Sequence, residues 1–187
     1  MRARQMKRII VITGTPGVGK TLLSKRLAKV LDAELINATD VVNRKHLYSR
    51  IEKGSKVVEM RRLRTELLKR IGSSGKNIVI VEGHLLCDIR IRNARVIVIR
   101  EHLRKLRQRL EERGYGSEKL IENIISEATD YCGIHASDNY RHVSEVMSSG
   151  RNAVGEMAAI ANGRKAGVRS IELLQELGPM LAKGMVL

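Results

Sequence analysis

The sequence contains no phenylalanine and no tryptophan, and tyrosine accounts for only four of its 187 residues. Its core must therefore consist of Ile, Leu, Val, Met and Ala, and aromatic side chains are too scarce for a general RNA-binding surface based on stacking. Two cysteines are too few for a disulfide framework. No apolar run approaches the roughly 18 residues of a membrane span, so we expect no membrane association and a cytoplasmic protein.

Acidic residues are also few, with 20 Asp and Glu against 35 Lys and Arg, which gives a net charge of +15. Such a balance favours anionic partners, meaning nucleotides, RNA or a ribonucleoprotein. A hydrophobic fraction of 43% argues against a disordered chain, and a length of 187 residues suits one α/β domain.

The strongest motif lies near the start of the chain, where the apolar run Ile9–Ile12 leads into GTPGVGKT at residues 14–21. Glycines let the backbone turn tightly enough for several N–H groups to converge on a phosphate, and the N-terminus of the following helix favours the same anion. In such a P-loop, Lys20 can reach the β and γ phosphates of a bound triphosphate, and the Thr21 hydroxyl can bind Mg²⁺.

The apolar pattern predicts strands alternating with helices, and therefore a parallel sheet covered by helices. We expect strands at 7–13, 34–37, 77–82, 95–100 and 143–147, and helices at 20–31, 101–113, 117–131, 151–161 and 170–177. The basic stretch 43–70 is predicted to form two helices divided near Gly54. Ligands of such sheets bind beyond the carboxyl ends of the strands.

Acidic and histidine side chains follow the third expected strand. Glu82 or Asp88 could orient Mg²⁺ through water, and His84 could hydrogen-bond the γ phosphate or the attacking group. The alternative is equally open from sequence alone: Glu82 caps a neighbouring helix, and His84 is an ordinary loop residue.

Arg109 and Arg113 lie four residues apart, on one face of a predicted helix that ends at Gly114-Tyr115-Gly116. Mobile arginines beside a flexible break suit a lid that closes over a transferred phosphoryl group. The alternative is a solvated basic helix without a catalytic role.

Two His/Cys pairs, His84-x-x-Cys87 and Cys132-x-x-His135, have ligand types and spacings that a zinc site allows. One pair lies on the expected nucleotide-facing loop, so zinc or a disulfide between the pairs is the less favoured alternative.

Three segments together resemble the adenylate kinase isoenzyme 6 family, the small archaeal adenylate kinase and coilin-interacting nuclear ATPase type. They are GTPGVGKT, VEGHLLCD and VIVIREHLRKLRQRLEERGYGSEKLIENIISEA, and the similarity runs from about Arg8 to Ala128. The resemblance implies a three-layer α/β/α P-loop fold with five parallel strands in the order 2-3-1-4-5. It also implies a core of residues 1–36, 72–112 and 132–187, an AMP-binding insert at about 37–71, and a short lid at about 113–131.

The resemblance further implies transfer of the ATP γ phosphate to AMP, a slower ATPase activity, and maturation of the small ribosomal subunit through a ribosomal protein, with rRNA as a further partner. Matching positions suggest catalytic roles for Lys20, His84, Arg100, Arg109 and Arg113. ATP would contact Gly14, Pro16, Gly17, Val18, Gly19, Lys20, Thr21, Leu22, Arg109 and Arg113; AMP would contact Asp40, Arg44, Gly83 and His84; Mg²⁺ would be held by Thr21 and, through water, Glu82.

The sequence departs from the family pattern where AMP is expected to bind. Thr39 stands where Gly often precedes the loop acid Asp40, and Asn43 stands where an Arg often follows it, with Arg44 next. Two alternatives therefore remain open: a P-loop kinase with another small acceptor, and a ribosome-assembly ATPase without significant AMP kinase activity.

Overall fold

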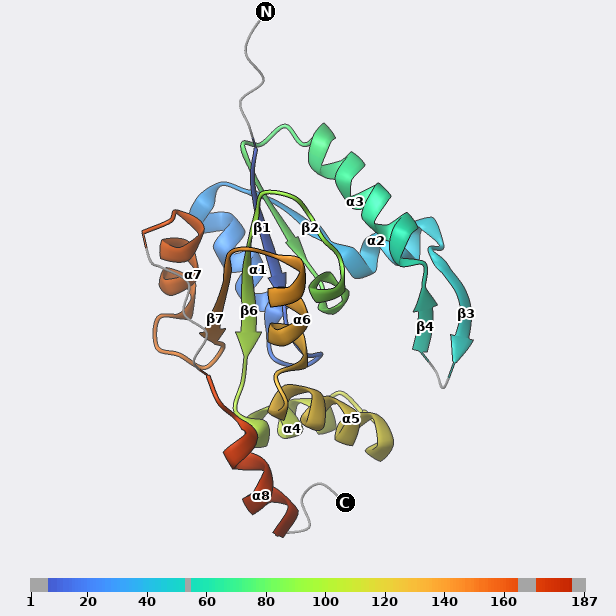
Figure 1. The fold of residues 1–187 in the computed structure, drawn as a ribbon, viewed down its shortest axis with the longest axis vertical. Helices are drawn as coiled ribbons and strands as arrows, with labels where there is room; N and C mark the ends of the chain where they lie inside the picture. Colours follow the sequence, from blue (N-terminus) through green and yellow to red (C-terminus); the bar gives the residue numbers. More distant parts are fainter. Residues whose placement is uncertain (1–6, 53–54, 165–170, 183–187) are drawn as a thin grey trace, which may run out of the picture.

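The computed structural model describes residues 7–52, 55–164 and 171–182. Its central sheet has five parallel strands in the order β2-β5-β1-β6-β7 (Figure 1). Counted along the chain without the small second sheet, this is the predicted order 2-3-1-4-5. The strands are β1 (Arg8–Thr13), β2 (Glu34–Asn37), β5 (Ile78–Glu82), β6 (Ala94–Arg100) and β7 (Val143–Met147).

The sheet separates two hydrophobic clusters. Side chains of its central strand β1 alternate between the two faces, so the strand contributes to both clusters. Ile10 and Ile12 belong to one cluster, and Val11 belongs to the other. The helices that contribute to the first cluster are α1 (Lys20–Leu31), α4 (Leu103–Glu112), α5 (Ser117–Ala128), α7 (Ala153–Ala161) and α8 (Leu174–Ala182); those that contribute to the second are α2 (Ala38–Lys45), α3 (Met60–Ser73) and α6 (Tyr131–Asn139), with the 3₁₀ helix η1 (His84–Asp88). The predicted three-layer α/β/α architecture is confirmed.

Helices α4 and α5 lie beyond the carboxyl end of β6, where Figure 1 shows them below the sheet. Parallel strands end on the same edge of a sheet, so this edge gathers the P-loop, the residues after β5 and the residues after β6. The fold thereby brings together most of the segments that carry predicted site residues.

The prediction of two helices divided near Gly54 is wrong for residues 48–52 and 55–58, which form strands. An antiparallel hairpin of β3 (Tyr48–Glu52) and β4 (Ser55–Val58) separates α2 from α3, and it projects to one side in Figure 1. Tyr48, Ile51, Val57 and Val58 favour strands over helix, but charged residues are interspersed with them. Gly54 itself lies outside the described residues.

The last predicted helix is also shifted. Its expected start, Ser170, lies outside the described residues, and its expected end at Gly178-Pro179 is wrong because α8 continues through Pro179. Proline removes one backbone donor from a helix interior. The adjacent Met180 is fully buried in the first cluster, and this packing stabilises the turn that contains the proline.

The expected helix 117–131 is two helices, since α5 ends at Ala128 and α6 begins at Tyr131. Between them, Asp130 adopts a left-handed conformation, and its side chain accepts a hydrogen bond from the Gly133 N–H. This N-cap starts a new helix in a new direction. Within the described parts of the chain, no helix is long and apolar enough to cross a membrane.

Candidate active site

The P-loop joins β1 to α1 and holds its lysine against its own backbone. The Nζ of Lys20 donates hydrogen bonds to the carbonyl oxygens of Gly14, at 2.8 Å, and Thr15, at 2.9 Å. Gly14 and Gly19 have φ values of 138° and 106°. A Cβ on Gly14 would also lie 2.4 Å from the carbonyl oxygen of Ile99, so only glycine fits this turn.

Three side chains meet at the start of α1 and form an oxygen-rich site. The Thr21 hydroxyl donates to Oε1 of Glu82 at 3.1 Å, and Nδ2 of Asn37 donates to the same oxygen. Glu82 is only 2% exposed, so these donors stabilise a buried carboxylate. Hydroxyl and carboxylate oxygens are ligands that Mg²⁺ prefers, and the residues present therefore fit the expected ion. Asn37 was missed by the sequence analysis.

Two neighbouring cavities open at this edge of the sheet. The P-loop cavity has a volume of about 370 Å³, and the second cavity, which we call the acceptor cavity, has a volume of about 520 Å³. Four residues line both: Pro16, Thr39, Gly83 and His84. The P-loop cavity is also lined by Gly17, Gly19, Lys20, Thr21, Leu22, Glu82, Arg109 and Arg113, all of them residues predicted for the site.

His84 lies at the junction of the two cavities, at the start of η1. Although its side chain is exposed at the cavity mouth, desolvation by the surrounding protein lowers its pKa to about 4, and the charges of Lys20 and Lys119 act in the same direction. The imidazole is therefore neutral at pH 7 and can both donate and accept a hydrogen bond.

The two predicted lid arginines are placed differently from one another. Nη1 of Arg109 donates to the carbonyl oxygen of Val18 at 2.9 Å, and Nη2 pairs with the buried carboxylate of Glu101 at 2.8 Å. Arg109 thus links the P-loop backbone to Glu101, and it also lines the P-loop cavity. Arg113, the C-cap residue of α4, is exposed and also lines this cavity.

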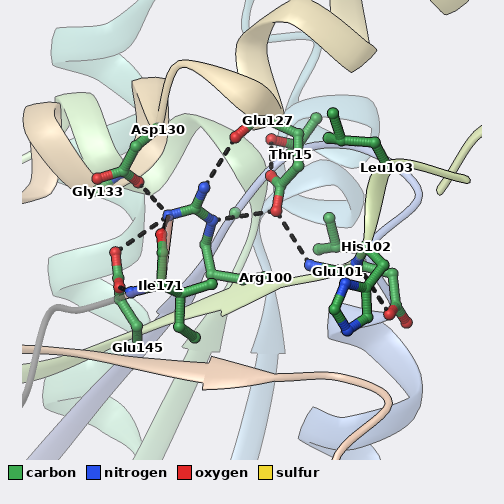
Figure 2. A network of polar contacts seen from close by, with 12 residues as sticks. Thr15, Arg100, Glu101, His102, Leu103, Glu127, Asp130, Gly133, Glu145 and Ile171 are labelled. Atoms are coloured by element: carbon green, nitrogen blue, oxygen red, sulfur yellow. Dashed lines mark hydrogen bonds and ion pairs between the residues drawn. The ribbon is translucent and has the colours of Figure 1, made fainter. Parts of the chain in front are cut away.

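Arg100, predicted to be catalytic, is instead buried in a network of carboxylates (Figure 2). Its side chain is 1% exposed, and its guanidinium group pairs with Glu127 at 3.0 Å, Asp130 at 2.6 Å and Glu145 at 3.1 Å. It is not among the residues that line the two cavities described above. This geometry favours a structural role over the predicted catalytic one, because the guanidinium group is buried and paired with three carboxylates.

The network around Arg100 reaches the P-loop through one residue of α5. Oε2 of Glu127 accepts a hydrogen bond from the Thr15 hydroxyl at 2.5 Å, and its Oε1 accepts one from the Glu101 N–H at 3.0 Å. Glu127 and Thr15 are both about 1% exposed. The C-terminal end of α5 is thus hydrogen-bonded to the phosphate-binding loop.

The acceptor cavity contains only part of the predicted AMP site. Gly83 and His84 line it, whereas Asp40 and Arg44 are exposed and do not line it. Because α2 begins at Ala38, its helical turn directs Thr39 and Asn43 to the cavity rather than Asp40 and Arg44, whose contacts with AMP stay predictions.

Two cationic residues that the sequence analysis missed line the acceptor cavity. Lys56, on β4, has its Nζ 2.6 Å from Oδ1 of Asn43 and 4.4 Å from the ring centre of Tyr48. Lys119 reaches the same cavity from α5, and Tyr115 reaches it from the segment between α4 and α5. The helical prediction for residues 48–58 concealed Lys56, since only the hairpin brings it to the cavity.

The two His/Cys pairs do come together, but not as a zinc site. Sγ of Cys87 lies 3.9 Å from Sγ of Cys132, while His135 is paired with Asp88 at 2.5 Å. In the part of the chain that the structure describes, no group of three or more His, Cys, Asp or Glu side chains could hold a metal ion.

Comparison with known proteins identifies the family. A family model described as an AAA domain matches residues 10–130. A Methanosarcina acetivorans protein named "Putative adenylate kinase" is 34% identical over 183 residues, which cover 91% of this chain and 94% of that protein. A Thermococcus kodakarensis protein of the same name is 36% identical over 166 residues, which cover 86% and 88% of the two chains. The chain belongs to this archaeal adenylate kinase family.

Family membership confirms the resemblance inferred from the three sequence segments. The crystal structure of shikimate kinase from Aquifex aeolicus covers 83% of this chain and 97% of its own, with a TM-score of 0.52 and 18% identity. That likeness shows the fold, which is one that P-loop kinases share. Together, family and fold support a nucleotide-using kinase.

Proposed function

We propose that this protein is a nucleoside monophosphate kinase that transfers the γ phosphate of ATP to AMP. The observation that carries the proposal is the pair of adjoining cavities, one around the P-loop lysine and one lined by two further lysines, which share His84 at their junction. Phosphoryl transfer between two nucleotides needs adjoining sites, because the attacking oxygen of the acceptor and the leaving oxygen of the donor must lie in line with the transferred phosphorus.

The donor side is formed by the P-loop. Lys20 is positioned to exchange its bonds with the loop carbonyls for bonds to phosphate oxygens, and Arg109 keeps the loop in shape through Val18. A magnesium ion held by Thr21 and, through water, by Glu82 would neutralise charge on the transferred phosphate. Arg113 is exposed at the cavity wall and is free to approach the same oxygens when the lid closes.

The acceptor side supplies positive charge rather than a base. The phosphate of AMP is already a nucleophile, so the protein only has to hold and orient it. Lys56 is suited to this because Asn43 and the Tyr48 ring fix its position. Neutral His84 can hydrogen-bond the transferred group without adding a charge that would have to be desolvated.

The test is to incubate the protein with ATP, Mg²⁺ and each nucleoside monophosphate in turn, and to quantify the products. We expect ADP to form fastest with AMP, in a ratio of two ADP for each ATP consumed. Lys56→Met should raise the KM for AMP about tenfold while leaving the KM for ATP unchanged. Lys45→Met, outside the acceptor cavity, is the matched control. ATP consumption that is independent of every acceptor would contradict the proposal.

A second candidate is an ATPase that acts in assembly of the small ribosomal subunit. The net charge of +15 and the departures at Thr39 and Asn43 favour it. Stimulation of ATP hydrolysis by a small-subunit ribosomal protein, in the absence of AMP, would support this function. Binding of rRNA and a cytoplasmic location stay predictions from the sequence.

A further inference from the structure

Cys87 and Cys132 are two thiols that phosphoryl transfer does not use. They are the only cysteines of the chain, 45 residues apart, and both are reduced and buried. Cys87 lies on η1, which begins at His84, and Cys132 lies in the first turn of α6, which follows the lid segment. Their Sγ atoms are 3.9 Å apart.

We propose that this pair is a redox-active dithiol, which a hydroperoxide converts into an intramolecular disulfide. A disulfide bond is about 2.05 Å long, so the sulfur atoms have to approach by about 2 Å. Rotation about the Cα–Cβ bonds moves each sulfur atom by a comparable distance, and the direct contact means that no third group has to be displaced.

The surroundings of the pair favour Cys132 as the attacking thiol. A hydrogen bond from Cys87 lowers the pKa of Cys132, against the effect of burial, and the charge of Lys20 acts in the same direction. The Cys132 thiolate attacks one peroxide oxygen, the O–O bond breaks, and a sulfenic acid forms as hydroxide leaves. The Cys87 sulfur then loses its proton and attacks the Cys132 sulfur, the S–O bond breaks, and the hydroxyl group leaves with that proton as water. Two thiols and one H₂O₂ give one disulfide and two H₂O.

Oxidation would alter the hydrogen bonds of the backbone at His84. The single S–H of Cys87 can donate either to Cys132 or to the carbonyl oxygen of His84, which lies 3.2 Å from Sγ, and the Thr13 hydroxyl donates to the same carbonyl oxygen, also at 3.2 Å. The disulfide removes the first donor and leaves the second. It also ties η1, at the acceptor cavity, to α6, at the end of the lid segment. Oxidation should therefore lower kcat about threefold to tenfold by restricting lid movement, a consequence that rests on the proposed kinase function.

The experiment treats the full-length protein with hydrogen peroxide and counts alkylatable thiols by mass spectrometry after denaturation. We expect the native monomer to lose both thiols and two hydrogen atoms, to show a Cys87–Cys132 linked peptide, and to melt at a higher temperature. Dithiothreitol should reverse all three changes. Cys132→Ala should prevent them, and Cys87→Ala should stop the reaction at an oxidised, unpaired Cys132.

Two results would overturn the inference. Native protein that keeps both thiols, under conditions in which the urea-unfolded chain forms the disulfide, would show that the folded pair is not reactive. A disulfide that joins only separate chains, seen as a dimer on a non-reducing gel, would show the same. If the disulfide forms while kcat stays unchanged, the link to the acceptor cavity is wrong. The thiol measurements need no kinase activity, so failure of the proposed function is a separate result.

Discussion

Lys20 is a nearly buried cation whose hydrogen bonds end on carbonyl oxygens of its own loop. We expect Lys20→Met to reduce ADP formation by at least about 100-fold, because the transferred phosphate loses its main fixed positive charge. The fold should persist, since methionine fills a similar volume and removes a charge whose burial is unfavourable. Steady-state ADP formation and a thermal melt followed by circular dichroism measure the two effects.

Lys25→Met is the control for this change, because Lys25 lies on the same helix but is exposed to solvent. It should leave both turnover and melting temperature close to those of the original protein. ADP formation by Lys20→Met at the unmodified rate would contradict the assignment of the P-loop.

His84 gives a pH-dependent prediction at the same scale. Its pKa is lowered from 6.5 to about 4 in the folded protein, so between these values the unfolded chain binds more protons. The contribution of His84 to stability is therefore complete above about pH 6.5 and decreases as the pH falls towards 4. We expect the difference in melting temperature between the original protein and His84→Gln to shift against the original protein between pH 7 and pH 5. An NMR titration in which the His84 ring has a midpoint near 6.5 would contradict this.

The predicted lid is best tested through Arg113, the C-cap residue of α4, which precedes Gly114. We expect Arg113→Ala to lower kcat about tenfold or more with little change in stability, because an exposed arginine acts on the transferred phosphoryl group only after the lid closes. Initial rates of ADP formation at saturating ATP and AMP give kcat directly. Arg104→Ala, an exposed change on the same helix, is the control. A kcat equal to that of the control would exclude this lid model.

Elements with strong local signals could be predicted from the sequence. The P-loop and the buried strands followed from glycine spacing and from continuous apolar runs, which need no knowledge of distant residues. The β3–β4 hairpin could not, since charged side chains are interspersed with its few strand-forming residues and its pairing depends on where the chain turns back. That error concealed Lys56, which the hairpin alone brings to the acceptor cavity.

At the scale of the whole molecule, the sequence could not reveal what holds Arg100. Its three carboxylate partners are Glu127, Asp130 and Glu145, which come from α5, the cap of α6 and β7. Nothing in the residues near Arg100 indicates these partners, because the fold alone brings them to the end of β6. The sequence could show that an arginine ends this strand, but not that it is enclosed.

This network predicts a loss of stability rather than of chemistry when the guanidinium group is removed. We expect Arg100→Met to lower the free energy of unfolding by about 3–5 kcal/mol, because it leaves several buried carboxylates without their cation. Arg100→Lys should recover only part of this loss, since an ammonium group cannot bond in the fixed fork geometry of a guanidinium. Urea unfolding followed by circular dichroism measures both variants.

Arg95→Met, at the other end of the same strand and only half-buried, is the matched control and should change stability far less. Kinetics of the folded fraction then separate a stabilising role from a catalytic one. Since Glu127 also binds the Thr15 hydroxyl of the P-loop, Arg100→Met should raise the KM for ATP more than it lowers kcat. An unchanged unfolding midpoint combined with a kcat reduced 100-fold would instead show that Arg100 contacts the reacting phosphate, and that the closed network described above opens during turnover.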